Sequence, residues 1–306
     1  MLFRSTVAAV CLLALAGAAH AQTTPAELKD RVAAYVKPTN AERTQVAVDQ
    51  LTAAGFTPTV ETFEGGGRNT GPMEGRNVVV LIPGTGGGAG GEILMTAHYD
   101  AVKLRDGTMA QGVVDNAGSV VAVIEAARAL KANPPAHDVR LILFDQEELG
   151  LVGARKWIET HGVTEVAGVL NSDVAAYGDT MMYGQNNGAQ SAWVTRAVQE
   201  TCTARALPCV GYPTYPPSDD RAFSAAGAPV VSLGFQDQVG AHQMWLAFNG
   251  GESTGLAEGF VPRVFRTIHS ADDRIEAVEG EAIRLAADTY EAVIRAMDAR
   301  LAADGK

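Results

Sequence analysis

From residue 92 onward, short apolar runs that are typical of buried strands alternate with segments that have helical spacing. The strand-type runs are EILMTAHYD, VRLILFD, VAGVLNSD and PVVSLGF. The predicted helices include one apolar face made by Val120, Val123, Ile124, Ala127 and Leu130, and a closing face made by Ile283, Ala287, Tyr290, Ile294 and Met297. This alternation predicts a single α/β domain, in which a central twisted mixed sheet has helices on both faces.

Two helices and two strands are expected before this region. Amphipathic spacing predicts helices over residues 24–36 and 41–54, and β-type runs TPTVETF and RNVVVLIPG follow. The glycine run GTGGGAGG, residues 84–91, lacks the Gly-Lys-Ser/Thr ending of a phosphate-binding loop and leads into a strand. We therefore expect it to be a hairpin loop.

Residues 1–21 have the features of a secretory signal peptide. Arg4 precedes an apolar run that ends in Ala19-His20-Ala21, a small-x-small cleavage pattern. The run is too short and wrongly flanked for a membrane anchor. We expect cleavage before Gln22, a single domain over residues 22–306, and an exported protein that is periplasmic or secreted.

The chain is acidic. Its 24 lysines and arginines against 35 aspartates and glutamates give a formal net charge of -11, which becomes -12 without Arg4. An acidic chain is a poor candidate for binding nucleic acid or an anionic membrane. Outside the leader the cysteines are Cys202 and Cys209, and in an oxidising compartment we expect them to form a disulfide. That bond would brace the adjoining segment GYPTYPPSDD. The sequence does not predict an oligomeric state.

Acidic and imidazole side chains gather where the predicted strands end. EILMTAHYD ends in His98 and Asp100, GVVDNAGSV places Asp115 before a helix, LILFDQEE ends in Glu147 and Glu148, and VAGVLNSD ends in Asp173. Ligands bind beyond the carboxyl ends of strands in such folds. Each residue has a structural alternative: Asp115 as a helix cap, Asp173 as a turn residue, His98 as an interior histidine. Together they suit two divalent ions bridged by one carboxylate, with His269 as the best further ligand.

The order of these motifs resembles the secreted bacterial dizinc aminopeptidases, whose superfamily includes glutamate carboxypeptidases and glutaminyl cyclases. The resemblance runs from about Asn77 to Asp273 and includes an aspartate a few residues after the final histidine. It implies two zinc ions per chain and peptide substrates. The implied ligands are His98 and Asp173 for one ion, Glu148 and His269 for the other, with Asp115 bridging. Asp100 would orient the His98 ring.

The resemblance also implies catalytic roles for two residues. Glu147 would act as the general base, and Tyr215 would stabilise the oxyanion. Two departures from the family pattern concern the pocket: the chain has Ser218-Asp219-Asp220 where many relatives have Ser-Asp-His, and Ile268 where many have tyrosine. Tyr215 could instead only pack against the prolines that follow it.

Several functional alternatives stay open at this level. A glutaminyl cyclase would use a single zinc, and a non-catalytic member would bind peptides without cleaving them. A carboxypeptidase would need cationic residues for a terminal carboxylate, for which Arg105, Arg221 and Arg263 are candidates. The insertion at residues 240–260 could form a lid or specificity wall, or a disordered surface loop.

Overall fold

The computed structural model describes residues 23–68, 70–88, 90–251 and 253–303, so the expected signal peptide lies outside the described residues. Within these ranges the chain forms an eight-stranded sheet with the order β1-β2-β4-β3-β5-β8-β6-β7. The strands are β1 Thr59–Gly65, β2 Met73–Ile82, β3 Glu92–His98, β4 Asp138–Phe144, β5 Val166–Ser172, β6 Thr180–Gly184, β7 Cys209–Tyr212 and β8 Val230–Gln236.

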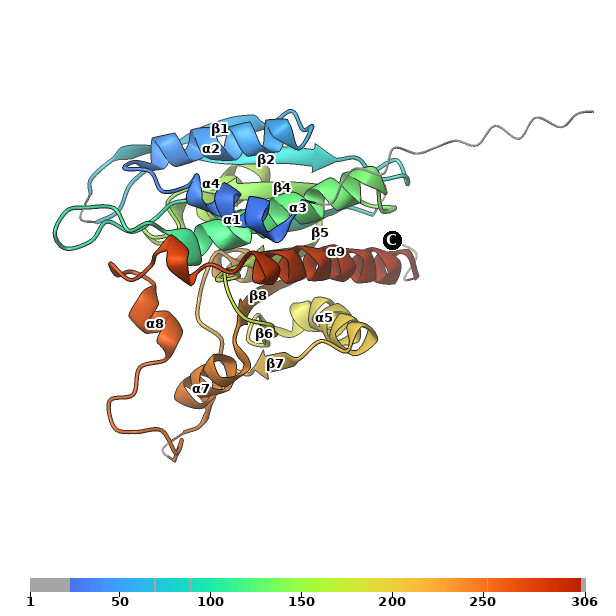
Figure 1. Cartoon of the computed structure of the whole chain (residues 1–306). Coiled ribbons are helices and arrows are strands. Elements are labelled where there is room, and N and C mark those ends of the chain that lie inside the picture. The colour runs from blue at the N-terminus through green and yellow to red at the C-terminus, as the bar shows by residue number, and fades with distance from the viewer. Residues whose placement is uncertain (1–22, 69, 89, 252, 304–306) are drawn as a thin grey trace, which may run out of the picture.

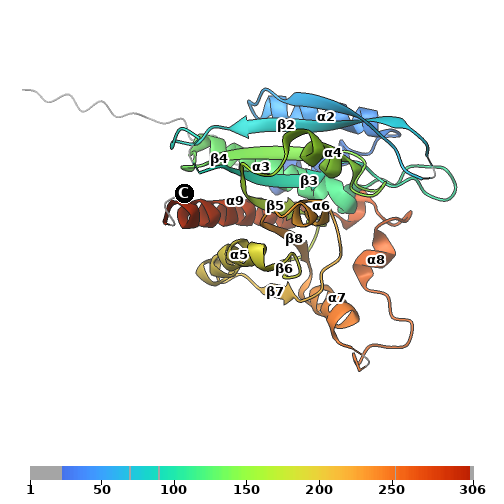
Figure 2. The ribbon, with the colours of Figure 1, turned by 180° about the vertical axis from the view of Figure 1, so that it is seen from behind.

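Helices cover both faces of the sheet, as Figures 1 and 2 show from opposite sides. One face carries the larger core and the helices α1 Pro25–Ala33, α2 Asn40–Ala53, α3 Gly118–Ala132, α5 Ala192–Arg205 and α9 Gly280–Ala303. The other face carries α4 Val152–His161 and α6 Asp220–Ala225. The remaining helical elements are η1 Val113–Ala117, η2 Ala189–Ser191, α7 Gln238–Asn249, α8 Arg263–Thr267 and η3 Ile275–Ala277. The predicted α/β fold is confirmed.

Burial on both faces explains why the central strands read as continuous apolar runs. In β4, Leu141 and Leu143 pack into the larger core, whereas Ile142 and Phe144 pack against α4 and α6. Adjacent strand residues point to opposite faces, so a sheet covered on both sides needs apolar residues at every position. Strands β3, β4, β5 and β8 are parallel, and their carboxyl ends therefore meet at one edge.

The expected hairpin between β2 and β3 is wrong. Strand β4 lies between them, pairing antiparallel with β2 and parallel with β3. The loop after β2 instead bonds to the segment entering β4, with the amides of Thr85 and Gly86 donating to the carbonyls of Pro135 at 2.9 Å and Ala136 at 2.8 Å. A Cβ at Gly84 would lie 2.3 Å from the Ala136 carbonyl oxygen, so glycine allows this close approach.

The second half of the fold holds two short strands that periodicity did not predict, β6 and β7. The expected Cys202–Cys209 disulfide is confirmed, and it ties α5 to the start of β7, with the two Cα atoms 6.2 Å apart. The insertion at residues 240–260 begins within the helix α7, in which Asp237 caps the amide of Gly240 at 2.9 Å. The alternative of a disordered surface loop is therefore wrong for residues 240–249, which are helical.

No helix within the described residues is long and apolar enough to cross a membrane.

Candidate metal and catalytic site

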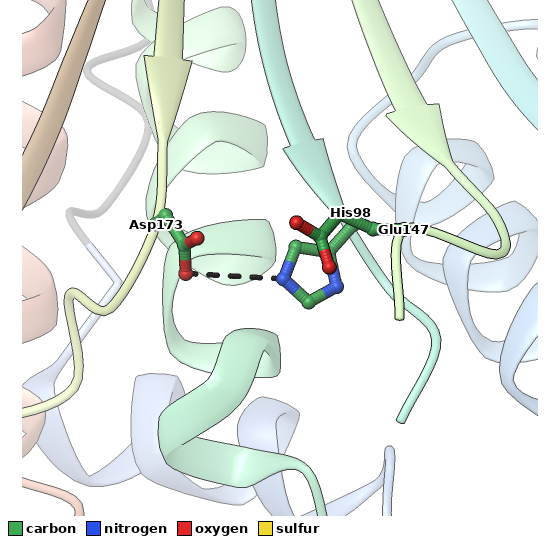
Figure 3. A group of neighbouring side chains, drawn as sticks. All are labelled: His98, Glu147 and Asp173. Atoms are coloured by element: carbon green, nitrogen blue, oxygen red, sulfur yellow. Dashed lines mark ion pairs between the residues drawn. The ribbon is translucent and has the colours of Figure 1, made fainter. Parts of the chain in front are cut away.

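The predicted site residues gather at the carboxyl edge of the sheet. His98 is the last residue of β3, Asp173 directly follows β5, and Glu147 and Glu148 lie in the turn between β4 and α4. Figure 3 shows the side chains of His98, Glu147 and Asp173 pointing toward one another. The His98 ring is 1% exposed, and its Nε2 lies 3.8 Å from Asp173 Oδ1.

Asp115 joins the two halves of this cluster. It lies in the turn η1 that leads into α3, where its own backbone angles are not helical. One of its carboxylate oxygens is 3.2 Å from His98 Nε2, and the other is 3.1 Å from His269 Nε2. The N-cap residue of α3 is Ala117, and no side chain caps this helix, so the helix-cap alternative for Asp115 is wrong. The geometry gives this carboxylate one oxygen for each half of the site.

His269 approaches from the far end of the chain. It lies in the turn after α8, and its Nε2 is also 3.1 Å from Glu148 Oε2. Two helices, α7 and α8, lie between the last strand β8 and this turn. Its φ of 55° lies in the left-handed region, which is uncommon for a residue other than glycine.

These side chains form two groups with the spacing of metal ligands. His98, Glu147 and Asp173 each offer an atom within 4.8 Å of the others, and so do Asp115, Glu148 and His269. Among the described residues, Glu148 Oε1 and Asp173 Oδ1 are buried without a hydrogen-bond partner. Imidazole nitrogens and carboxylate oxygens are the donors that zinc takes at catalytic sites, so the residues fit this ion.

The pKa values of the ionisable side chains in this cluster are shifted strongly by burial and by their charged neighbours. Burial raises the pKa of Glu147 to about 10, against the opposing effect of His98 and with Asp219 adding to the rise. Burial, with Asp115 adding, also raises the pKa of Glu148 to about 7. Hydrogen bonds to Asp115 and Glu148 raise the pKa of His269 to about 11. A divalent cation would supply the positive charge that protonated imidazoles otherwise provide.

Asp100 connects the His98 ring with the turn that carries the two glutamates. Its Oδ1 lies 3.3 Å from His98 Nδ1, but this contact does not have the geometry of a hydrogen bond. Its carboxylate also accepts the main-chain amides of Glu147 at 3.1 Å and Glu148 at 3.2 Å. One buried carboxylate thus binds the turn of the two glutamates and lies beside the His98 imidazole.

A cavity of about 320 Å³ opens beside this cluster. Its polar side is formed by Asp115, Glu147, Asp173, Tyr215, Gln236 and His269, and its apolar side by Val174, Met182, Pro216, Pro217, Met244, Val264, Phe265 and Ile268. Met244 belongs to α7, so part of the 240–260 insertion forms a wall of the cavity.

Tyr215 lies at the cavity between β7 and α6 and is 6% exposed. A Cβ added at Gly234 would lie 2.8 Å from the Tyr215 hydroxyl oxygen and 2.5 Å from the Asp173 carbonyl, so glycine leaves room for this phenol beside Asp173. Its ring also packs edge-on against Tyr212, with centroids 5.1 Å apart. Tyr215 therefore lines the cavity as well as packing against Tyr212.

Sequence reasoning assigned no role to Asp219. This residue is fully buried, both of its carboxylate oxygens lack a hydrogen-bond partner among the described residues, and burial raises its pKa well above the usual range. It is close enough to raise the pKa of Glu147. The departure at Ser218-Asp219-Asp220 was the signal that pointed to this loop.

The family profile for Peptidase family M28 matches residues 77–294, which is most of the chain. The chain belongs to peptidase family M28. This family consists of zinc-dependent peptidases, so this M28 protein is a member of a metallopeptidase family. The matched range includes each of the site residues described above.

The M28 chain is 31% identical over 130 residues, 41% of its length, to leupeptin-inactivating enzyme 1 of Streptomyces exfoliatus. It is 36% identical over 67 residues, 22% of its length, to aminopeptidase YwaD of Bacillus subtilis (strain 168). The matches to two curated relatives span 27% and 14% of the relatives' own lengths.

Two solved structures share the fold over almost their whole lengths. A Zn-dependent exopeptidase from Parabacteroides distasonis ATCC 8503 has a TM-score of 0.68 and 17% identity, covering 90% of this M28 chain and 98% of that one. The glutaminyl cyclase of Porphyromonas gingivalis has a TM-score of 0.68 and 16% identity, covering 92% and 100%. At these identities the likeness concerns the fold alone.

Proposed function

We propose that the protein is a dizinc aminopeptidase, which removes N-terminal residues from peptides. The observation that carries this proposal is the lining of the cavity, which combines carboxylates with apolar side chains. Among the described residues, no lysine or arginine lines it. A substrate's free α-amine suits such a site, whereas a terminal carboxylate would meet repulsion from Glu147 and Asp173.

Two of the three arginines that could bind a terminal carboxylate, Arg221 and Arg263, make contacts elsewhere. Arg263 stacks over the Tyr177 ring at 4.6 Å and lies 3.4 Å from Asp237 Oδ2. Arg221 donates to the main-chain oxygen of Asn186 at 3.1 Å. These contacts favour the aminopeptidase over the carboxypeptidase.

We assign the metal ligands as two pairs that share one carboxylate. His98 and Asp173 would hold one zinc ion, and Glu148 and His269 would hold the other. Asp115 would contribute one oxygen to each, which its contacts of 3.2 and 3.1 Å with the two histidines support. Asp100 would keep the His98 ring in the orientation that presents Nε2 to the ion.

The chemistry of peptide hydrolysis would then divide among a few side chains. Zinc, when bound, supplies a Lewis acid that lowers the pKa of a coordinated water and polarises the scissile carbonyl. Glu147 points at the His98–Asp173 pair, and the charge of a bound cation would favour its ionised form over the protonated form that burial alone favours. As a carboxylate it would accept the proton of the attacking water and pass it to the leaving amine. The Tyr215 phenol donates a hydrogen bond to the oxyanion that develops on the carbonyl.

Metal analysis tests this proposal. The purified mature protein should bind two zinc ions per chain, because five ligand-type residues surround two positions and one can be shared. Removing the metal with a chelator should abolish hydrolysis, and added zinc should restore it. Protein that retains full peptidase activity after its metal has been removed would contradict the proposal.

Glutaminyl cyclisation is the second candidate, because the cyclase of Porphyromonas gingivalis shares this fold over its full length. A cyclase related to this family would use a single zinc. Finding one tightly bound ion with no second site would favour the cyclase. Export through a leader at residues 1–21, and a single catalytic domain over residues 22–306, belong to the same proposal.

A further inference from the structure

Asp273 binds the turn that carries Asp115 through three consecutive main-chain amides. Its Oδ1 accepts from Val113 at 3.0 Å and Val114 at 2.8 Å, and its Oδ2 accepts from Asp115 at 3.2 Å. Asp273 is 1% exposed. Buried amides need partners, so this carboxylate both satisfies the turn and fixes the orientation of its main chain.

Arg43 binds the same turn from the other side, through carbonyls. Its guanidinium donates to the main-chain oxygens of Gln111 at 2.8 Å and Gly112 at 2.9 Å, and also to that of Tyr35 at 2.7 Å. Arg43 is fully buried, and it comes from α2, outside the range that the M28 profile matches.

Gly112 allows the turn to approach the Arg43 guanidinium closely. Gly112 has a φ of 58°, in the left-handed region, and an added Cβ would lie 2.9 Å from Arg43 Nη2 and 2.6 Å from the Ala101 Cβ. Glycine is therefore needed both for the conformation and for the close approach.

The same contacts connect the Asp115 turn to the segment that carries His269. Asp273 follows His269 by four residues, and its own amide donates to the Ser270 carbonyl at 3.3 Å. Gln111 adds a parallel link, since its Oε1 accepts the amide of Ile275 at 3.0 Å.

We propose that Arg43 and Asp273 are positioning residues that hold residues 111–115 between a buried cation and a buried anion. Through this clamp the Asp115 carboxylate keeps one oxygen toward His98 and the other toward His269. The inference rests on the proposed function, because it assigns these contacts to the arrangement of the metal ligands. Partners that hold a metal's ligands from behind commonly set its affinity.

Asp273→Asn tests the clamp with little change in shape. The remaining oxygen can still accept from Val113 and Val114, but the new amide group would face the Asp115 amide, donor against donor. Titration of the metal-free variant with zinc, in competition with a chelating dye, should show at least one ion bound about 10–100-fold more weakly than in the wild type. The absorption spectrum of the cobalt-substituted variant should change as well, since it reports ligand geometry.

Asp298→Asn is the matched control. Asp298 also accepts two consecutive amides, from Ala136 at 3.1 Å and His137 at 2.9 Å, just before β4 and therefore at the opposite end of that strand from the site. Both variants should lower the melting temperature of the metal-free protein, but Asp298→Asn should bind zinc as the wild type does. Equal zinc affinity in the two variants would overturn the clamp.

A second variant covers the case in which Asp273→Asn does not fold. Gln111→Ala removes the bond to the Ile275 amide and leaves both charges in place, and it should weaken zinc binding several-fold. Wild-type affinity in Gln111→Ala would then overturn the clamp. A wild-type protein that binds no zinc would overturn the proposed function itself, so the two failures are distinct.

Discussion

Replacing Glu147 by glutamine is expected to lower kcat by about 10²–10⁴-fold, the contribution usual for a general acid or base. Glutamine keeps the size of the side chain but does not accept a proton at neutral pH. KM and zinc content should change little, because Glu147 is assigned to proton transfer and not to holding the metal. Steady-state kinetics on an N-terminal amino acid anilide, with metal analysis of the same sample, measure both quantities.

Glu148→Gln is the matched comparison, because it should weaken zinc binding whereas Glu147→Gln should lower turnover. Glu148 contacts His269 at 3.1 Å and belongs to the second ligand group, so its replacement should weaken zinc binding, and added zinc should partly restore activity. Near-normal turnover in Glu147→Gln would contradict the assignment. The same holds if Glu147→Gln loses zinc as readily as Glu148→Gln does.

Tyr215→Phe should lower kcat by about 10²-fold, the loss typical of one oxyanion donor. The phenol would act mainly in the transition state, when the carbonyl oxygen gains charge, so KM should change little. Zinc content should also stay at the wild-type level, because Tyr215 is not an assigned ligand. Kinetics and metal analysis of the variant check both points.

Tyr212→Phe is a matched control for Tyr215→Phe. Tyr212 packs against Tyr215, but its own hydroxyl donates to the main-chain oxygen of Ala241 and does not line the cavity. Loss of this buried hydrogen bond should cost about 1 kcal/mol of stability and leave kcat near the wild-type value. If both variants have unchanged kinetics, Tyr215 has only a packing role.

The strands that lead to the site could be predicted because local sequence determines them. LILFDQEELG contains an apolar strand and then its acidic turn, and the parallel arrangement brings such strand ends to one edge. The expected hairpin after β2 was wrong because strand pairing depends on segments distant in sequence, here β4 at residues 138–144. Strands β6 and β7 were missed because they have five and four residues, too few to show a period.

Side chains that act through the main chain were the hardest to predict. Nothing local to Arg43 or Asp273 indicates that each would bind the turn before α3, because these contacts span 68 or more residues of sequence. The position of Asp273 shortly after His269 was visible, but its amide partners were not. For Asp219, the departure from the family pattern at residues 218–220 pointed to the loop but did not predict that this carboxylate is buried.

Mass spectrometry of the products from one peptide tests the central claim most directly. The zinc-loaded protein would be incubated with a peptide that begins with glutamine and with its N-acetylated form. A dizinc aminopeptidase should release the first residue from the free peptide and leave the acetylated form intact. Loss of ammonia from the free peptide without cleavage, or removal of residues from the carboxyl end of either form, would contradict the account.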